Sequence, residues 1–121
     1  MQTNYKLGQS NEILARNYTD ENGNPTGGYA HGPGLCIAWQ DGPRGKATWQ
    51  QTPTETLASA NGAFVEDALV AARQRLAFFQ ESKFACEANA EAIRHIDYAI
   101  EALHARAKER ASRGVHGSHA V

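Results

Sequence analysis

The sequence lacks three features that would each indicate a particular class of protein. It has no excess charge of one sign, because 12 basic residues face 13 acidic ones for a formal net charge of −1. A protein that coats nucleic-acid polymers through its net field is therefore not expected. No apolar run approaches the roughly 20 residues that a membrane span needs, and the first ten residues lack the basic start and apolar stretch of a secretory signal. We expect a small cytoplasmic protein without a membrane partner.

Cysteine is scarce. Cys36 and Cys86 are far apart in the sequence, and neither belongs to a Cys-x-x-Cys pair. A disulfide framework needs more cysteines at closer spacing. We expect both side chains to be small buried apolar groups, as free cysteine commonly is. A reactive thiol is the alternative.

Sequence motifs of enzymes and cofactor sites are absent as well. There is no Gly-x-Ser-x-Gly, no Gly-x-x-x-x-Gly-Lys and no His-Glu-x-x-His. The glycines between Gly27 and Gly45 do not precede a helix with dinucleotide-binding spacing. His95 and His104 are nine residues apart, about 180° around a helix, so they cannot share a zinc site within one chain. We therefore expect no catalysis, no cofactor and no metal.

Glycine and proline are nearly missing from the second half of the chain. Seven of the 11 glycines lie between Gly23 and Gly45, whereas residues 61–112 contain only Gly62 and no proline. Both residue types interrupt helices. The chain thus divides into a turn-rich region, about residues 1–60, and a helical region, about residues 61–121. With 121 residues, we expect the two regions to form a single domain.

Apolar residues of the helical region recur with the spacing of an α-helix. Asn61 is the expected cap of a first helix, and Ser82 the expected cap of a second helix from about residue 85 to residue 112. Gly114 stands where glycine commonly follows a helix end. Because only residues 80–83 separate the two helices, we expect an antiparallel hairpin.

The turn-rich region contains one clear strand candidate, Leu35 to Gln40, in which apolar side chains alternate. Residues 41–45 have turn chemistry, and residues 47–51 are the candidate return strand of a β-hairpin. Tyr18 to Gly32 is polar and glycine-rich and is interpreted as a loop or mobile arm, and Asn11 to Asn17 as a short helix. The predicted fold class is α+β, an antiparallel two-helix hairpin with a small N-terminal β-hairpin.

Such a fold cannot enclose a full core. Alanines surround much of the second helix and would let another helix approach closely. Apolar surface that cannot be buried within a chain is usually buried between chains. We therefore expect an obligate homo-oligomer. The alanines are Ala88, Ala90, Ala92, Ala99, Ala102, Ala105 and Ala107.

The components of a nucleotide pocket occur near the two ends of the predicted helices. Phe78, Phe79 and Phe84 are aromatic rings that can stack on a base, and Asn89 can hydrogen-bond to a base edge. Arg106 and Arg110 are four residues apart and project from one helix face, where they can bind a phosphate. The alternative is that the aromatics pack and the basic residues stabilise the helix dipole. Asn89 and Arg106 are roughly 25 Å apart along one helix. They can hold one small ligand only if two antiparallel protomers place opposite helix ends together.

Several compact motifs in the helical region are distinctive enough to indicate a protein family. They are Phe64-Val65-Glu66-Asp67, Arg75-Leu76-Ala77-Phe78-Phe79-Gln80, Ser82-Lys83-Phe84-Ala85-Cys86 with Asn89-Ala90, and Arg113-Gly114-Val115-His116-Gly117-Ser118-His119. From Gly62 onward the sequence resembles the phage Acb/Tad hairpin family of anti-defence proteins. Trp39-Gln40-Asp41-Gly42-Pro43 is similar to the β-hairpin part of the Thoeris anti-defence branch of that family.

The resemblance implies a function without catalysis. Members bind cyclic signal nucleotides of the host immune system and hold them intact, away from their effectors, in the host cytoplasm. The ligands are glycocyclic ADP-ribose and, in hexameric members, also cyclic di- and trinucleotides. By motif position, Phe79 would stack on the base, Asn89 would hydrogen-bond, and Arg106 and Arg110 would clamp the pyrophosphate. The implied partners are cyclic nucleotides and further copies of the chain, as a hexamer.

Two other functions stay open. One is a helical-hairpin oligomer that acts as an adaptor for a host or phage protein, and the other is a nucleotide-hydrolysing enzyme. The sequence also departs from the family pattern. Glu87-Ala88 stands where the family commonly has Arg-Glu, which affects contacts beside Asn89. His116 stands where the family commonly has Glu.

Overall fold

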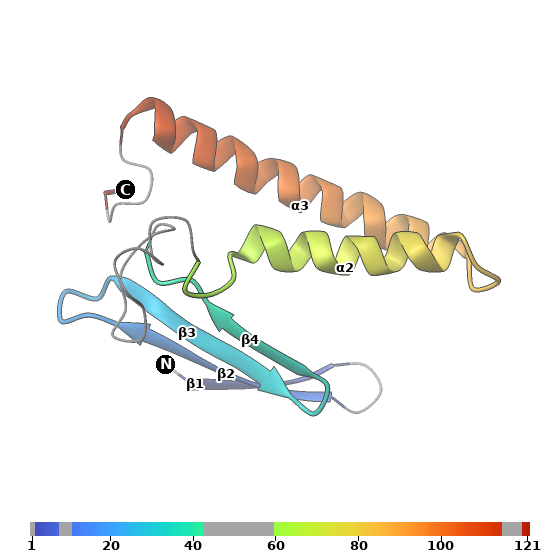
Figure 1. Ribbon diagram of the computed structural model, residues 1–121, viewed down its shortest axis with the longest axis horizontal. Helices are drawn as coiled ribbons and strands as arrows, with labels where there is room; N and C mark the ends of the chain where they lie inside the picture. Colours follow the sequence, from blue (N-terminus) through green and yellow to red (C-terminus); the bar gives the residue numbers. More distant parts are fainter. Residues whose placement is uncertain (1, 8–10, 43–59, 115–119) are drawn as a thin grey trace. The chain divides into compact units, whose positions relative to one another are not determined.

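The computed structural model describes residues 2–7, 11–42, 60–114 and 120–121, with only the backbone given for residues 2–7 and 11–12. It consists of two compact units (Figure 1). The first comprises Met1–Phe64 with Gly117–Ala120, and the second Val65–His116 with Val121. Whether the chain is a single folding domain stays a prediction.

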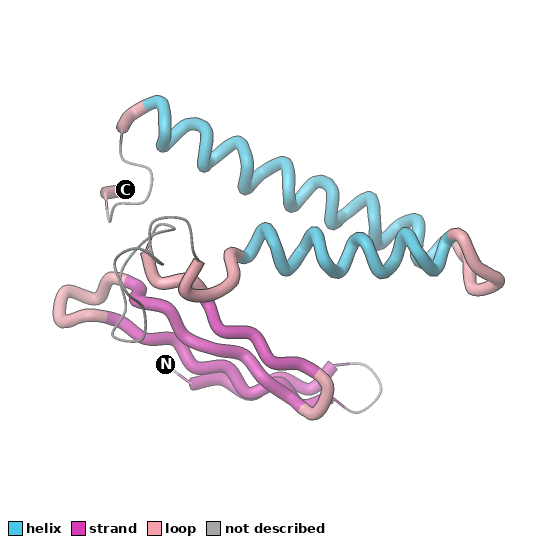
Figure 2. The backbone as a smooth tube through the Cα atoms, viewed as in Figure 1, coloured by secondary structure: helices cyan, strands magenta, loops and turns pink. Residues whose placement is uncertain are grey.

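The first unit is a four-stranded antiparallel sheet in which consecutive strands are neighbours (Figures 1 and 2). Its strands are β1 (Gln2–Leu7), β2 (Asn11–Thr19), β3 (Pro25–Gly32) and β4 (Leu35–Trp39). Ala30 on β3 is buried, and its register partners are Ala15 on β2 and Ile37 on β4. Because side chains alternate along a strand, Tyr29 lies on the opposite face of the sheet.

Strand β4 confirms the predicted strand, which ends one residue earlier than expected. Two other predictions for this region are wrong. Asn11 to Asn17 is part of strand β2 and not a helix, and Tyr18 to Gly32 contains the end of β2, a turn and strand β3 rather than a loop. The β region is thus larger than a hairpin. The predicted return strand, residues 47–51, lies outside the described residues, and β4 pairs with β3.

A side-chain hydrogen-bond pattern closes the turn between β2 and β3. The Asp20 carboxylate accepts hydrogen bonds from the backbone N–H groups of Asn22 and Asn24, each at 2.9 Å. Gly23 within this turn has φ of 81°, a conformation that glycine adopts without steric cost. This turn chemistry brings β2 and β3 together.

The chain returns to the sheet just before the helical unit. The Asn61 side chain accepts a hydrogen bond from the backbone N–H of Asp41 at 2.7 Å and donates one to its carbonyl at 2.8 Å. Ala63 forms a parallel bridge with Trp39 at the end of β4. The prediction that Asn61 caps a helix is therefore wrong, because its amide is used by the sheet and the helix begins at Val65.

The second unit is the predicted antiparallel helical hairpin (Figure 1). Its helices are α2 (Val65–Gln80) and α3 (Glu87–Ser112). Two hydrogen bonds from the Arg73 guanidinium to the Asp97 carboxylate join one helix to the other. The predicted end of α3 is confirmed, since Arg113 is its C-cap and Gly114 follows with φ of 72°.

The start of α3 differs from the prediction. Its N-cap is Cys86, whose side chain makes no capping hydrogen bond. Ser82 instead donates to the carbonyl of Phe79 at 2.6 Å and accepts from the N–H of Phe84 at 3.1 Å. Ser82 therefore shapes the loop that follows α2 and does not cap α3.

The helical unit contains little buried surface. No residue of α2 or α3 is buried, and Val70 remains 48% exposed. The prediction of buried cysteines is also wrong, because Cys36 and Cys86 are both exposed. Cys36 pairs with His31 on the face opposite Ala30, and Cys86 lies in the loop before α3. None of the described helices is long and apolar enough to cross a bilayer.

Candidate functional site

The four predicted ligand residues all lie on the helical hairpin, at its two ends. Phe79 is near the end of α2 and Asn89 is in the first turn of α3, so both lie beside the connecting loop. Arg106 and Arg110 lie in the last turns of α3. The 17 residues between Asn89 and Arg106 place the two ends roughly 25 Å apart along the helix. One protomer does not bring the four residues together.

The loop end carries a cluster of aromatic rings and a guanidinium. The ring centroids of Phe78 and Phe79 are 6.2 Å apart. The Arg75 guanidinium carbon lies 4.9 Å from the Phe79 centroid and 5.2 Å from that of Phe78. This is cation–π geometry. Arg75 was not among the predicted ligand residues, although its position four residues before Phe79 places both on one helix face.

Asn89 has a structural partner in the loop. Its amide nitrogen donates a hydrogen bond to the carbonyl of Phe84 at 3.1 Å. The Gln80 side chain supports the same loop, because it accepts from the N–H of Cys86 at 3.0 Å and donates to its carbonyl at 3.1 Å. These contacts fix the backbone between α2 and α3. Asn89 therefore holds the loop in position next to the aromatic cluster.

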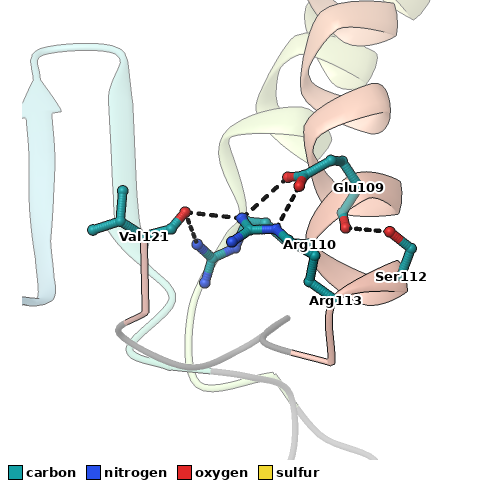
Figure 3. A network of polar contacts seen from close by, with 5 residues as sticks. All are labelled: Glu109, Arg110, Ser112, Arg113 and Val121. Atoms are coloured by element: carbon teal, nitrogen blue, oxygen red, sulfur yellow. Dashed lines mark hydrogen bonds and ion pairs between the residues drawn. The ribbon is translucent and has the colours of Figure 1, made fainter.

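At the other end of α3, two guanidinium groups converge on one backbone oxygen (Figure 3). Arg113 donates to the Val121 oxygen at 2.9 Å, and Arg110 lies 3.5 Å from the same oxygen. Arg113 also forms an ion pair with Glu109. The arrangement shows that these arginines can approach a single oxygen from two sides. The resemblance did not assign a role to Arg113, although it lies three residues from Arg110 on the same face.

Charge pairs organise the middle of α3. The Arg94 guanidinium, and after it the His95 ring, hydrogen-bond to Glu91 and lower the pKa of that carboxylate. The Arg73 guanidinium likewise lowers the pKa of Asp97. Within the described part of the chain, no three His, Cys, Asp or Glu side chains lie close enough together to hold a metal ion.

The comparison with protein families fits this geometry. Residues 44–108 match the family described as the hairpin domain of Acb2/Tad1, which is more than half of the 121 residues. The chain belongs to the Acb2/Tad1 hairpin family. The matched range includes all of α2, most of α3, and the predicted ligand residues Phe79, Asn89 and Arg106. Arg110 lies two residues beyond it, and strands β1 to β4 lie outside it. The resemblance inferred from the motifs is thus confirmed.

A curated phage protein is similar to part of the chain. The chain is 43% identical over 60 residues to Thoeris anti-defense 1 of Bacillus phage SBSphiJ7. The aligned part is 50% of this chain and 42% of the relative. The chain therefore spans less than half of the length of this relative.

Proposed function

We propose that this chain is a phage anti-defence protein that binds a cyclic nucleotide immune signal and holds it intact. The observation that carries the proposal is the family match, because it covers the helical hairpin that bears Phe79, Asn89 and Arg106. The similarity to a phage protein named Thoeris anti-defense 1 supports the anti-defence role. We further propose glycocyclic ADP-ribose as the main ligand and cyclic di- and trinucleotides as additional ones.

The loop end of the hairpin suits the base of such a ligand. In the proposal, the base stacks on the Phe79 ring, whose neighbour Arg75 already makes a cation–π contact with it. Asn89 uses one amide N–H for the Phe84 carbonyl. A side-chain amide has a second N–H and an acceptor oxygen, and these are the groups proposed to contact the base edge.

The basic end of the hairpin suits the pyrophosphate. Arg106 is exposed on α3, and Arg110 lies one helical turn further along. Arg110 and Arg113 both contact the Val121 oxygen. A bound phosphate oxygen would need two guanidinium groups to approach it in the same way. Bidentate guanidinium contacts are the strongest hydrogen bonds available for a phosphate.

A complete pocket requires two protomers. The base-binding end and the phosphate-binding end are roughly 25 Å apart in one chain, whereas two antiparallel hairpins place them side by side. The absence of buried residues from α2 and α3 favours association, because exposed apolar groups such as Val65, Val70 and Phe84 would gain burial. We propose a homo-oligomer, a hexamer by family resemblance, as the functional unit.

The proposed action is sequestration without catalysis. A protein that sequesters a signal acts by mass action, so it needs tight binding and an excess of sites over signal molecules. It needs neither a nucleophile nor a general base. A chain with several sites per oligomer meets this requirement.

One experiment separates this function from the adaptor and enzyme alternatives. The full chain is mixed with glycocyclic ADP-ribose or with a cyclic dinucleotide, and free ligand is measured by chromatography. The protein is then denatured by heat and the ligand is measured again. We expect depletion followed by recovery of intact ligand. Recovery of degraded ligand would show an enzyme, and a ligand that is never depleted would contradict nucleotide binding and favour the adaptor.

A further inference from the structure

The antiparallel sheet has two chemically different faces. Ala30 is buried, and its cross-strand neighbours Ala15 and Ile37 make its face apolar. The opposite face, called the Tyr29 face below, is partly exposed, because Leu14 and Tyr29 are half-buried on it and its other described side chains are exposed. These others are Arg16, Tyr18, His31, Cys36 and Ala38. An exposed sheet face is ordinarily covered by scattered polar side chains, so a concentration of rings on it calls for an explanation.

The rings of the Tyr29 face form a continuous row across two strands. The Tyr18 and Tyr29 centroids are 6.3 Å apart in an edge-on arrangement. The Tyr29 and His31 rings are stacked with centroids 5.4 Å apart. Tyr18 is nevertheless 46% exposed, and His31 is exposed. The row therefore keeps ring surface available to a ligand while its members hold one another in place.

Arg16 supplies a positive charge to this face. Arg16 is exposed and lies directly opposite Tyr29 in the register of β2 and β3. It makes none of the ion pairs found among the described residues. The described side chains of β2, β3 and β4 include no carboxylate. A guanidinium beside an aromatic row is suited to an anion attached to a flat ring.

Small residues flank the row on the β4 side. Ala38 lies opposite Tyr29, and Cys36 lies opposite His31. Both are exposed, and neither is tall enough to cover the rings. A planar group can therefore lie over Cys36 and Ala38, beside the rings, without meeting a large side chain.

We propose that the Tyr29 face binds a nucleoside phosphate, with the base against the ring row and the phosphate on Arg16. Aromatic side chains on a sheet and a neighbouring cation are a recurrent means of holding bases. The site lies on β2 to β4, outside the range that matches the hairpin family. None of its residues is among those proposed for the nucleotide site on α2 and α3.

The test uses the full chain carrying Arg110→Ala, so that binding at the proposed hairpin site is weakened. Ligand-observed NMR titrations are made with AMP, adenosine and ribose 5-phosphate. We expect AMP to bind in the millimolar range and about tenfold more tightly than either fragment. Tyr29→Leu and Arg16→Gln should each weaken AMP binding about tenfold. Tyr18→Leu is the second ring variant, in case Tyr29→Leu fails to fold.

Matched controls are available on the helical unit. Tyr98→Leu removes an exposed ring, and Arg94→Gln removes an exposed guanidinium, and neither should change AMP affinity. The inference is overturned if AMP does not bind, if ribose 5-phosphate binds as well as AMP, or if both ring variants bind AMP like their parent. A failure of this kind is distinguishable from failure of the proposed function, which is read from depletion of cyclic nucleotides by the unmodified chain.

Discussion

Gly62 has no room for a side chain. A Cβ atom there would lie 2.5 Å from the carbonyl oxygen of Trp39, and this contact is with backbone that cannot rotate away. The close approach accompanies the bridge between Ala63 and Trp39. The single glycine of residues 61–112 is therefore explained by packing against β4 and not by a turn.

We expect Gly62→Ala to lower the free energy of unfolding by about 1–3 kcal/mol, because backbone must shift to admit the methyl group. The measurement is urea unfolding followed by tryptophan fluorescence, since both tryptophans belong to residues 1–64. Gly34→Ala is the control, because nothing lies within 4 Å of a Cβ at that position. Equal midpoints for the two variants would contradict the close approach.

A second prediction at the residue scale concerns Arg110. Charge-assisted hydrogen bonds contribute about 1.5–3 kcal/mol each, so Arg110→Ala should weaken cyclic nucleotide binding at least tenfold in calorimetry. The oligomer should stay intact, which size-exclusion chromatography checks. Arg94→Ala is the matched control, since Arg94 pairs with Glu91 on the same helix. Unchanged affinity in Arg110→Ala would refute the assignment of Arg110 to the pocket.

At the scale of elements, the helices were predictable and most of the sheet was not. Helical periodicity is local, and residues 65–112 contain no glycine or proline to interrupt it. Strands β2 and β3 depend on partners across the sheet. Gly27 and Gly28 have φ of 93° and 151°, and a Cβ at Gly28 would lie 2.3 Å from the Arg16 carbonyl. Glycines that indicated a loop are required here by close strand pairing.

The candidate site was likewise predictable only in part from the sequence. The motifs located Phe79, Asn89 and both arginines on the correct elements, because motif position depends only on the sequence. The roles of Arg75 and Arg113 emerged only from side-chain geometry. Likewise, no sequence pattern indicated that the Asn61 side chain would hydrogen-bond to the backbone just after β4 instead of capping a helix. Its partner Asp41 is 20 residues away.

The ion pair between α2 and α3 gives a prediction at the element scale. Arg73 lowers the pKa of Asp97, so this carboxylate stabilises the folded hairpin above its unfolded pKa. That stabilisation is lost as the pH falls through the lower folded pKa. Asp97→Asn should therefore lower the Tm at pH 7, and the difference should shrink below about pH 4.

The measurement is thermal unfolding by circular dichroism at several pH values, which follows the helices. Glu101→Gln is the control, because Glu101 is an exposed carboxylate of the same helix. A Tm difference for Asp97→Asn that is the same at pH 7 and pH 3 would contradict a role for the charge.

At the scale of the whole molecule, the described residues contain very little core. Ala30 is the one buried apolar side chain among them. A chain of 121 residues ordinarily buries well over half of its unfolded surface. Association between copies is the proposed source of the missing burial, and exposed apolar groups on α2 are its candidate contacts.

We expect the chain to sediment as an oligomer at micromolar concentration. Val70→Glu should shift it toward smaller species, because a carboxylate would have to be buried at the interface. Asn22→Asp introduces a negative charge at an exposed position of the turn between β2 and β3 and should leave the mass unchanged. Analytical ultracentrifugation measures all three proteins. A monomeric parent chain would contradict the proposed assembly.

The link between Asn61 and Asp41 also bears on which of the two positions can change. Both hydrogen bonds use backbone groups of Asp41, its N–H and its carbonyl. The link therefore depends on the side-chain amide of Asn61 and not on the type of side chain at residue 41. Only a side chain that both accepts and donates can form this pair of bonds.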